Sequence, residues 1–113
     1  SSDTVSPEIV LDRFSILFNL IRQQLGNKSN ITFVSIKPSI SRWRLEAKIV
    51  AANALIANFI AKQTNANYIN IHNAMLQVDG SVMKDIFIAD NLHMNAKGYA
   101  IWQKIIAPSL LVK

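Results

Sequence analysis

An apolar stripe at helical spacing is the first strong pattern along the chain. Apolar residues recur every three or four positions: Val10, Phe14, Leu17, Phe18, Ile21 and Leu25. Ser6-Pro7-Glu8 precedes this stripe, and a capping serine, a first-turn proline and an acid in that order are typical of a helix start. Gly26 follows the stripe, as expected of a helix end. The pattern predicts an amphipathic helix over residues 7–25.

Two short segments typical of β-strands flank a long apolar segment with helical character. Residues 31–36 are β-branched and nearly all apolar, as expected of a strand buried on both faces of a parallel sheet. Residues 68–71 form a second candidate strand. Between the two, residues 42–63 are rich in Ala, Leu and Ile, which predicts a largely covered helix. Strand, helix and strand in this order predict a right-handed crossover and therefore a parallel sheet.

Beyond residue 71 the pattern changes to turns and one more helix. Val78-Asp79-Gly80-Ser81 is a turn signal. Asn95 is a suitable cap for a last helix over residues 95–107, which Pro108 would end. The residues expected to point inward from this helix are Tyr99, Trp102, Ile105 and Ile106.

Together these elements predict an α/β fold with about two parallel strands and three helices. A chain of 113 residues, of which 50% are hydrophobic and 17% charged, is long enough to pack as one small domain. A two-stranded sheet exposes its edges and is marginal on its own. We therefore expect further strands, from outside residues 1–113, to pair with it.

Charge and cysteine content exclude some classes of function. The net charge of +5 comes from cations scattered between Arg13 and Lys113, so we interpret it as surface charge and expect no nucleic acid partner. The absence of cysteine excludes disulfides and thiolate chemistry but leaves the compartment, and so the localisation, open. Residues 1–6 lack the features of a secretory signal. The most apolar stretch, residues 49–61, is shorter than the about 20 residues of a transmembrane helix.

The candidate chemistry lies in Asp90-Asn91-Leu92-His93, where a carboxylate precedes an imidazole by three residues. Imidazoles titrate near neutral pH, and a carboxylate that accepts the Nδ1–H orients the ring so that Nε2 faces the reacting group. The segment lies between the last predicted strand and a capped helix, and ligands of parallel α/β sheets bind at this edge. Asp90 and His93 are therefore candidate catalytic residues, but they need a nucleophile, and none is evident in the sequence.

The stretch from Asp90 to Trp102, DNLHMNAKGYAIW, resembles the last sequence block of the SGNH hydrolases, also called GDSL-type lipases and esterases, which reads D-x-x-H-x-N-x-x-G-Y. Other stretches resemble the same order of segments in bacterial members: Ser6-Pro7-Glu8, Ser35-Ile36-Lys37-Pro38-Ser39 with Arg42-Trp43, and Met75-Leu76 before Asp79-Gly80. The similarity covers nearly the whole chain. The family fold is a flavodoxin-like three-layer α/β/α sandwich of five parallel strands, so the resemblance implies that residues 1–113 are the C-terminal half of one such domain.

In that family, His93 would be the general base that activates a serine, and Asp90 would orient it. The serine nucleophile, and the glycine and asparagine that complete the oxyanion hole, belong to three blocks that residues 1–113 do not contain. The resemblance therefore implies a serine ester hydrolase whose serine comes from an N-terminal half or from another chain, and we expect the isolated chain to be inactive. Arg42 would lie near the rim of the site, as a candidate contact for the ester substrate.

Other residues in the chain could be assigned chemistry. Ser39 and Ser41 lie between a strand and a helix, where a nucleophile elbow would be, but no glycine flanks either of them. We expect Ser41 to cap the long helix and Ser39 to lie in a turn. A metal site would need convergent ligands such as His72, His93, Asp79 and Asp85, which show no recognised ligand spacing, so no metal or cofactor is expected.

A second hypothesis is a non-catalytic α/β module that pairs through its sheet edge with another chain. Its discriminating feature is the unpaired edge of the sheet. A purified chain that is monomeric, folds cooperatively and restores no esterase activity with an N-terminal half would contradict completion of the sheet by that half. Nucleic-acid binding is a third and weaker interpretation, because the cations form no single face.

Overall fold

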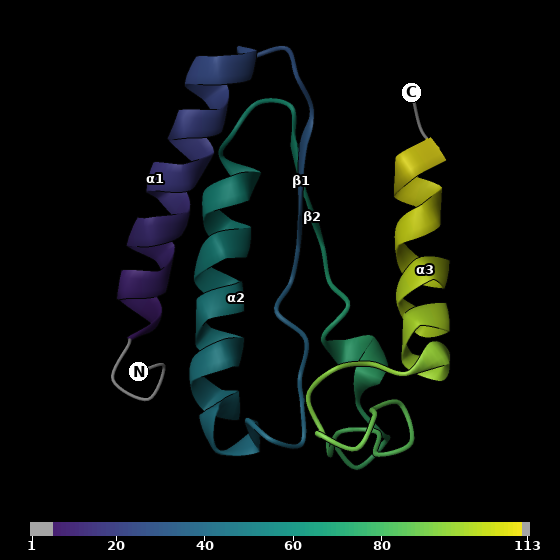
Figure 1. The fold of residues 1–113 in the computed structure, drawn as a ribbon. Helices are drawn as coiled ribbons and strands as arrows, with labels where there is room; N and C mark the ends of the chain where they lie inside the picture. The colour runs from purple at the N-terminus through teal and green to yellow at the C-terminus, as the bar shows by residue number, and fades with distance from the viewer. Residues whose placement is uncertain (1–5, 112–113) are drawn as a thin grey trace. The chain divides into compact units, whose positions relative to one another are not determined.

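The computed structural model of the chain describes residues 6–111, and the side chains of residues 6–108 (Figure 1). The elements, in chain order, are α1 (Pro7–Leu25), β1 (Ile31–Val34), the 3-10 helix η2 (Trp43–Leu45), α2 (Glu46–Ala61), β2 (Ala66–Ile69), the 3-10 helix η3 (Asn73–Met75) and α3 (Ala96–Leu111). The chain thus forms a small α/β domain, with three α-helices and a two-stranded sheet in the described part. No helix among residues 6–111 combines the length and apolar character needed to cross a membrane.

The two strands are parallel, as predicted. Ile31 N–H donates to the Asn65 carbonyl at 2.9 Å, and four residues later Ser35 N–H donates to the Ile69 carbonyl at 2.9 Å. Donor and acceptor positions advance in the same direction, which only a parallel pair allows. The prediction that the first strand is buried on both faces is wrong, because Thr32 is exposed while its neighbours are half-buried. Side chains of a strand alternate between its faces, so Thr32 shares a face with Val34, and only Thr32 is exposed on it, since Val34 packs against the apolar core around Ile69.

The chain divides into two compact units: one is the chain up to Phe33 together with Leu45–Tyr68, and the other is Val34–Arg44 together with the chain from Ile69 onward. In the first unit α1 packs beside α2 (Figure 1). The ring of Phe14 meets the ring of Phe33 edge-on at 4.9 Å, and Phe18 meets Phe59 edge-on at 5.4 Å. Such edge-to-face pairs are favoured by the ring quadrupole, so aromatic contacts hold α1 to β1 and α1 to α2.

The bounds of α1 agree with the sequence prediction. The Ser6 side chain accepts a hydrogen bond from Ile9 N–H at 3.2 Å, and Gly26 ends the helix with a φ of 83° that favours glycine. The expected stripe is wrong at Leu17, which is 54% exposed, whereas Phe18 is 2% exposed. Successive residues of a helix are rotated by about 100°, so Leu17 lies at the margin of the apolar face whose centre includes Phe18.

The long helix begins later than predicted, because a 3-10 turn precedes it. The α-helical part runs over Glu46–Ala61 instead of residues 42–63, and no side chain caps its first residue. Ser41 therefore does not have the predicted capping role. The side chain of Ser39, 3% exposed, instead accepts a hydrogen bond from Arg42 N–H at 3.3 Å, and this turn sets the start of η2.

The second unit has its own apolar core, to which α3 contributes. The core residues are Ile69, Ile71, Met75, Val82, Ile86, Phe87, Met94 and Ile106. Tyr99 was expected among the inward residues, but it is 54% exposed, and Ile101 packs against the core instead. Helix α3 also continues past Pro108 to Leu111. A proline removes only one helical donor, and both Lys104, whose carbonyl loses it, and Pro108 are exposed, so water can take its place.

Candidate active site

Asp90 and His93 lie on a tight loop whose two sides are bridged where Phe87 pairs antiparallel with Met94. Ile88 N–H donates to the His93 carbonyl at 2.9 Å across the loop. Phe87 and Met94 are 8% and 9% exposed, so the base of the loop is anchored in the core. The loop therefore projects the Asp90 and His93 side chains from a fixed base.

The two predicted catalytic side chains meet. His93 Nδ1 lies 2.5 Å from Asp90 Oδ2. The other carboxylate oxygen, Oδ1, accepts hydrogen bonds from Leu92 N–H at 2.9 Å and His93 N–H at 3.0 Å. The hydrogen bond from the His93 side chain is the largest cause, and the two backbone bonds the next, of a lowered pKa of Asp90, which falls to about 2. Asp90 is therefore a carboxylate at neutral pH.

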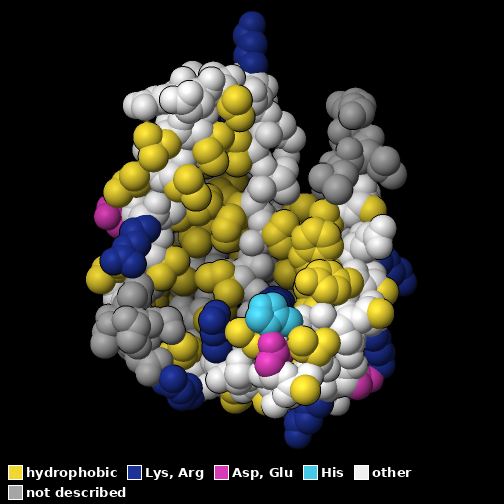
Figure 2. Space-filling model, in the orientation of Figure 1, with side chains coloured by type: hydrophobic (Ala, Val, Ile, Leu, Met, Phe, Trp, Pro, Cys, Tyr) yellow, Lys and Arg dark blue, Asp and Glu magenta, His cyan; other side chains and the backbone are white. Residues whose placement is uncertain are grey.

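An ionised carboxylate can only accept hydrogen bonds, so His93 Nδ1 must be the donor. In a neutral imidazole the proton then sits on Nδ1 and the lone pair on Nε2. The His93 side chain is 70% exposed, and no hydrogen bond within the described residues engages Nε2. Figure 2 shows one histidine at the surface against an acidic side chain, with hydrophobic side chains beside them. The arrangement can take a proton from a hydroxyl group that is placed at Nε2.

The residues after His93 fix the start of α3. Asn95 Oδ1 accepts Gly98 N–H at 3.0 Å, which confirms Asn95 as the predicted cap, and its Nδ2 donates to the Asp85 carbonyl at 2.9 Å. A Cβ on Gly98 would lie 2.6 Å from the carbonyl oxygen of Ile86, so only glycine allows this close approach. The asparagine and glycine of the D-x-x-H-x-N-x-x-G-Y pattern thus have structural roles: they fix the N-terminus of α3, which begins three residues after His93.

The segment between β1 and η2 lies against the same loop. Ser41 N–H donates to the Asn91 carbonyl at 3.0 Å, and Lys37 Nζ donates to the Leu92 carbonyl at 2.6 Å. Burial first, and then the nearby Arg42 guanidinium, lower the pKa of Lys37, while Asp90 acts in the opposite direction. Lys37 is therefore close to Asp90, and Arg42 is close to Lys37.

Sequence reasoning named Arg42 and missed Lys37. The available signal was a lysine directly after the strand predicted over residues 31–36. In the structure β1 ends at Val34, and Lys37 lies three residues beyond it, in a segment where Ser35 and Pro38 are buried. A cation in such a place needs a specific acceptor.

No serine side chain among residues 6–108 forms a hydrogen bond with His93. Most of these hydroxyls have structural partners elsewhere: Ser6 with Ile9 N, Ser15 with Asp12 O, Ser29 with Leu25 O, Ser35 with Ile71 N and His72 N, Ser39 with Arg42 N, and Ser81 with Asp79. Ser41 contributes its backbone N–H to the loop. The described part of the chain thus brings the two candidate residues, Asp90 and His93, together, without a serine paired to His93.

The residues considered as metal ligands do not converge. His72 is 4% exposed, with Nδ1 3.1 Å from Asn73 Oδ1. Asp79 accepts hydrogen bonds from Ser81 within the predicted turn, and Asp85 forms an ion pair with Lys97. Within residues 6–111 no three His, Asp or Glu side chains are grouped so as to hold a metal ion.

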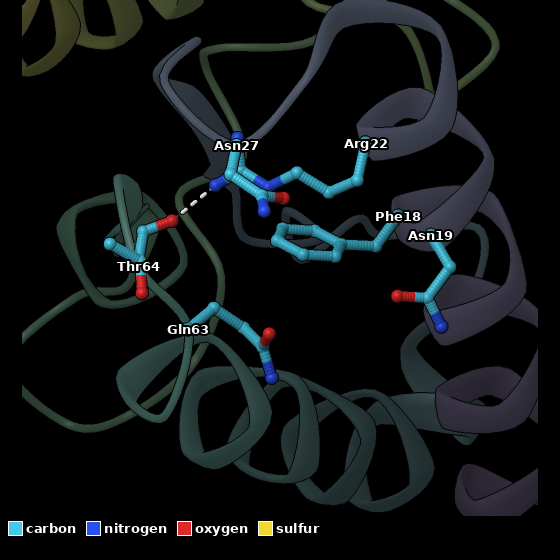
Figure 3. Close-up of a pocket in the computed structure, with 6 residues that line it drawn as sticks. All are labelled: Phe18, Asn19, Arg22, Asn27, Gln63 and Thr64. Carbon is cyan, nitrogen blue, oxygen red and sulfur yellow. Dashed lines mark hydrogen bonds between the residues drawn. The ribbon is translucent and has the colours of Figure 1, made fainter.

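A separate pocket of about 270 Å³ lies in the first unit, lined by Phe18, Asn19, Arg22, Asn27, Gln63 and Thr64 (Figure 3). The Arg22 guanidinium extends across it and donates to the carbonyls of Gly26, Ser29, Thr64 and Asn65. Its donors are therefore engaged by the backbone, and we interpret Arg22 as a clamp between the end of α1 and the start of β2.

His93→Ala is expected to raise the pKa of Asp90 from about 2 toward its ordinary value of 3.8, because the largest cause of the lowering is removed. The two backbone bonds should keep it somewhat below that value. Since the folded-state pKa is depressed, the Asp90 interactions stabilise the fold above about pH 4, and this stabilisation is lost as the pH falls through the folded pKa. Titration of the carboxyl ¹³C signals in the wild-type chain and in the His93→Ala variant measures the change in the Asp90 pKa. An unchanged Asp90 pKa would contradict the pairing of Asp90 with His93.

Comparisons with known proteins bear on the fold. No family model matches the chain, and no curated protein matches it. Its structure is similar to a solved chain from Streptococcus pneumonia, described as "a putative platelet activating factor", with a TM-score of 0.81 and 16% sequence identity. The match covers 96% of this chain and 53% of that one, so the chain spans about half the length of the similar structure. At this identity the likeness shows that the chain has the α/β fold of part of that protein.

Proposed function

We propose that residues 1–113 are the C-terminal part of an SGNH-type, or GDSL-type, serine ester hydrolase domain. In this proposal His93 is the general base, Asp90 orients it, and the serine nucleophile comes from outside these residues. The observation that carries the proposal is the 2.5 Å contact between Asp90 Oδ2 and His93 Nδ1, which leaves Nε2 exposed. The fold is then the C-terminal half of a flavodoxin-like three-layer sandwich, completed by an N-terminal half or by another chain.

In the proposed mechanism, Asp90 and His93 are two members of a Ser-His-Asp triad, and the serine lies outside residues 1–113. His93 Nε2 takes the proton of the serine hydroxyl as the serine oxygen attacks the ester carbonyl carbon. The imidazolium then gives this proton to the leaving alkoxide, and an acyl-serine remains. Water, activated by the same nitrogen, hydrolyses the acyl-serine and regenerates the site. Asp90 stays ionised and stabilises the imidazolium in both steps, in keeping with its pKa of about 2.

Three further observations support the proposal. The structure explains two residues of the D-x-x-H-x-N-x-x-G-Y pattern, because Asn95 and Gly98 fix the start of α3 beside His93. The fold likeness covers nearly all of this chain but about half of the similar one, as expected of one continuous part of a larger domain. Arg42 is exposed and forms no ion pair among residues 6–111, so it stays a candidate contact for the ester substrate.

A fluorophosphonate probe, which labels activated serines, tests the proposal. The isolated chain should remain unlabelled, because no serine in its described part is paired with His93. The reading frame that precedes Ser1 should be translated and searched for a strand followed by Gly-Asp-Ser, and the chain then expressed together with that segment. We expect the assembled protein to be labelled, and the same assembly with His93→Ala to be labelled far more slowly.

Two results would contradict the proposal. Labelling of the isolated chain that His93→Ala abolishes would place the nucleophile inside residues 1–113. A stable assembly that contains Gly-Asp-Ser but is never labelled would favour the non-catalytic module, which binds a partner through its sheet edge.

A further inference from the structure

The loop that carries His93 is held at three consecutive carbonyl groups. Each accepts one hydrogen bond: Asn91 from Ser41 N–H at 3.0 Å, Leu92 from Lys37 Nζ at 2.6 Å, and His93 from Ile88 N–H at 2.9 Å. Asn91, at the tip, has a left-handed φ of 57°. Asparagine adopts this conformation more readily than most residues, so the tip suits a tight turn. Of the three donors, Ile88 belongs to the loop itself, whereas Lys37 and Ser41 lie outside it.

Two of these bonds act on the peptide groups that hold Asp90. The Leu92 carbonyl and the His93 N–H belong to one peptide group, so Lys37 binds its oxygen end while Asp90 Oδ1 accepts its N–H. The peptide group before it is held in the same way, by Ser41 N–H at one end and Asp90 Oδ1 at the other. Because a peptide group is planar, fixing its oxygen also fixes the direction of its N–H. The segment after β1 thus sets the orientation of the Asp90 carboxylate.

Lys37 is the one side-chain donor among the three, so substitution can remove its bond and leave the backbone intact. Its ammonium also lies 5.7 Å from the centre of the Phe87 ring, at the base of the loop. Burial disfavours this charge, as its lowered pKa indicates, and the carbonyl and the ring compensate for it. Because these contacts fix the Lys37 ammonium in one place, it can hold the Leu92 carbonyl in a defined position, which a mobile, exposed lysine could not do.

We propose that Lys37 is a positioning residue for the Asp90–His93 pair: by binding the Leu92 carbonyl, it orients the peptide group that holds the Asp90 carboxylate against His93 Nδ1. This inference rests on the proposed function, and it names the group that keeps the general base in its competent tautomer.

The tautomer of His93 is the readout, because a loss of stability alone does not change it. The chain contains two histidines, so the His93 signals can be identified by their loss in His93→Ala. Long-range ¹H–¹⁵N spectra of the neutral ring distinguish the Nδ1–H from the Nε2–H tautomer. Lys37→Met keeps the apolar stem and removes the donor, and Lys104→Met is the matched control on an exposed lysine.

We expect the ratio of the Nδ1–H to the Nε2–H tautomer of His93 to fall about tenfold in Lys37→Met, the factor that a hydrogen bond to a charged group typically contributes. Lys104→Met should leave it unchanged, and Lys37→Arg, which keeps a cationic donor, should restore it. If thermal unfolding shows that Lys37→Met does not fold, Lys37→Gln gives the same comparison with a polar side chain too short to reach the carbonyl. A ratio in the folded Lys37 variant equal to that of Lys104→Met would overturn the role of Lys37 and leave the proposed function intact. A wild-type chain without the Nδ1–H tautomer would overturn both.

Discussion

Asp90→Asn should lower kcat about 10⁴-fold in the proposed serine-containing assembly, with little change in KM, by analogy with serine triads. The asparagine amide can present N–H instead of oxygen to Nδ1, which favours the Nε2–H tautomer and removes the lone pair that must accept the serine proton. Asp90 is exposed and lies at the surface of the loop, so the substitution should change the fold little. The loss is therefore expected in the chemical step.

Steady-state hydrolysis of a small aryl ester measures this loss. Asp79→Asn is the matched control, since Asp79 is an exposed aspartate that accepts hydrogen bonds only from its own turn. An Asp90→Asn enzyme that keeps a tenth or more of the wild-type kcat would contradict the assignment of Asp90. Because the Asp90 pKa is about 2, activity between about pH 5 and 9 should not vary through titration of this group.

Local signals in the sequence predicted those parts of the fold that local physics decides. Ser6, Pro7 and Gly26 fix α1 because capping and termination involve residues a few positions apart. Asn95 fixes the start of α3 for the same reason. The Asp90–His93 contact was also predictable, because a tight loop brings residues three apart together.

Long-range contacts decided what sequence reasoning missed. Lys37 and Leu92 are 55 positions apart, and the residues around each of them do not predict the hydrogen bond between the two. The exposure of Tyr99 and Leu17 likewise depends on which neighbours cover each helix face. Hydrophobic periodicity shows that a helix has an apolar face, but it sets the direction of that face only to within a residue or two.

Gly98→Ala should destabilise the chain by about 2 kcal/mol, although alanine is the better helix former by about 1 kcal/mol at an ordinary position. The added Cβ would lie 2.6 Å from the Ile86 carbonyl oxygen and 2.9 Å from Met94 Cβ. That same oxygen accepts a hydrogen bond from Asn95 N–H at 2.9 Å. To make room for the added Cβ, α3 must move away from Ile86, which weakens this hydrogen bond at the start of the helix.

Urea unfolding of the wild-type chain and the Gly98→Ala variant measures the difference. Gln103→Ala, at an exposed position of α3, is the control for helix propensity and should be neutral or slightly stabilising. Gly80→Ala is a control that distinguishes steric overlap from backbone strain. No atom lies within 4 Å of its added Cβ, but the φ of 90° at this position disfavours an L side chain. We expect this variant to lose about 1 kcal/mol of unfolding free energy. If Gly98→Ala were as stable as Gln103→Ala, the close approach to Ile86 would not constrain α3. The glycine of the D-x-x-H-x-N-x-x-G-Y pattern would then need another explanation.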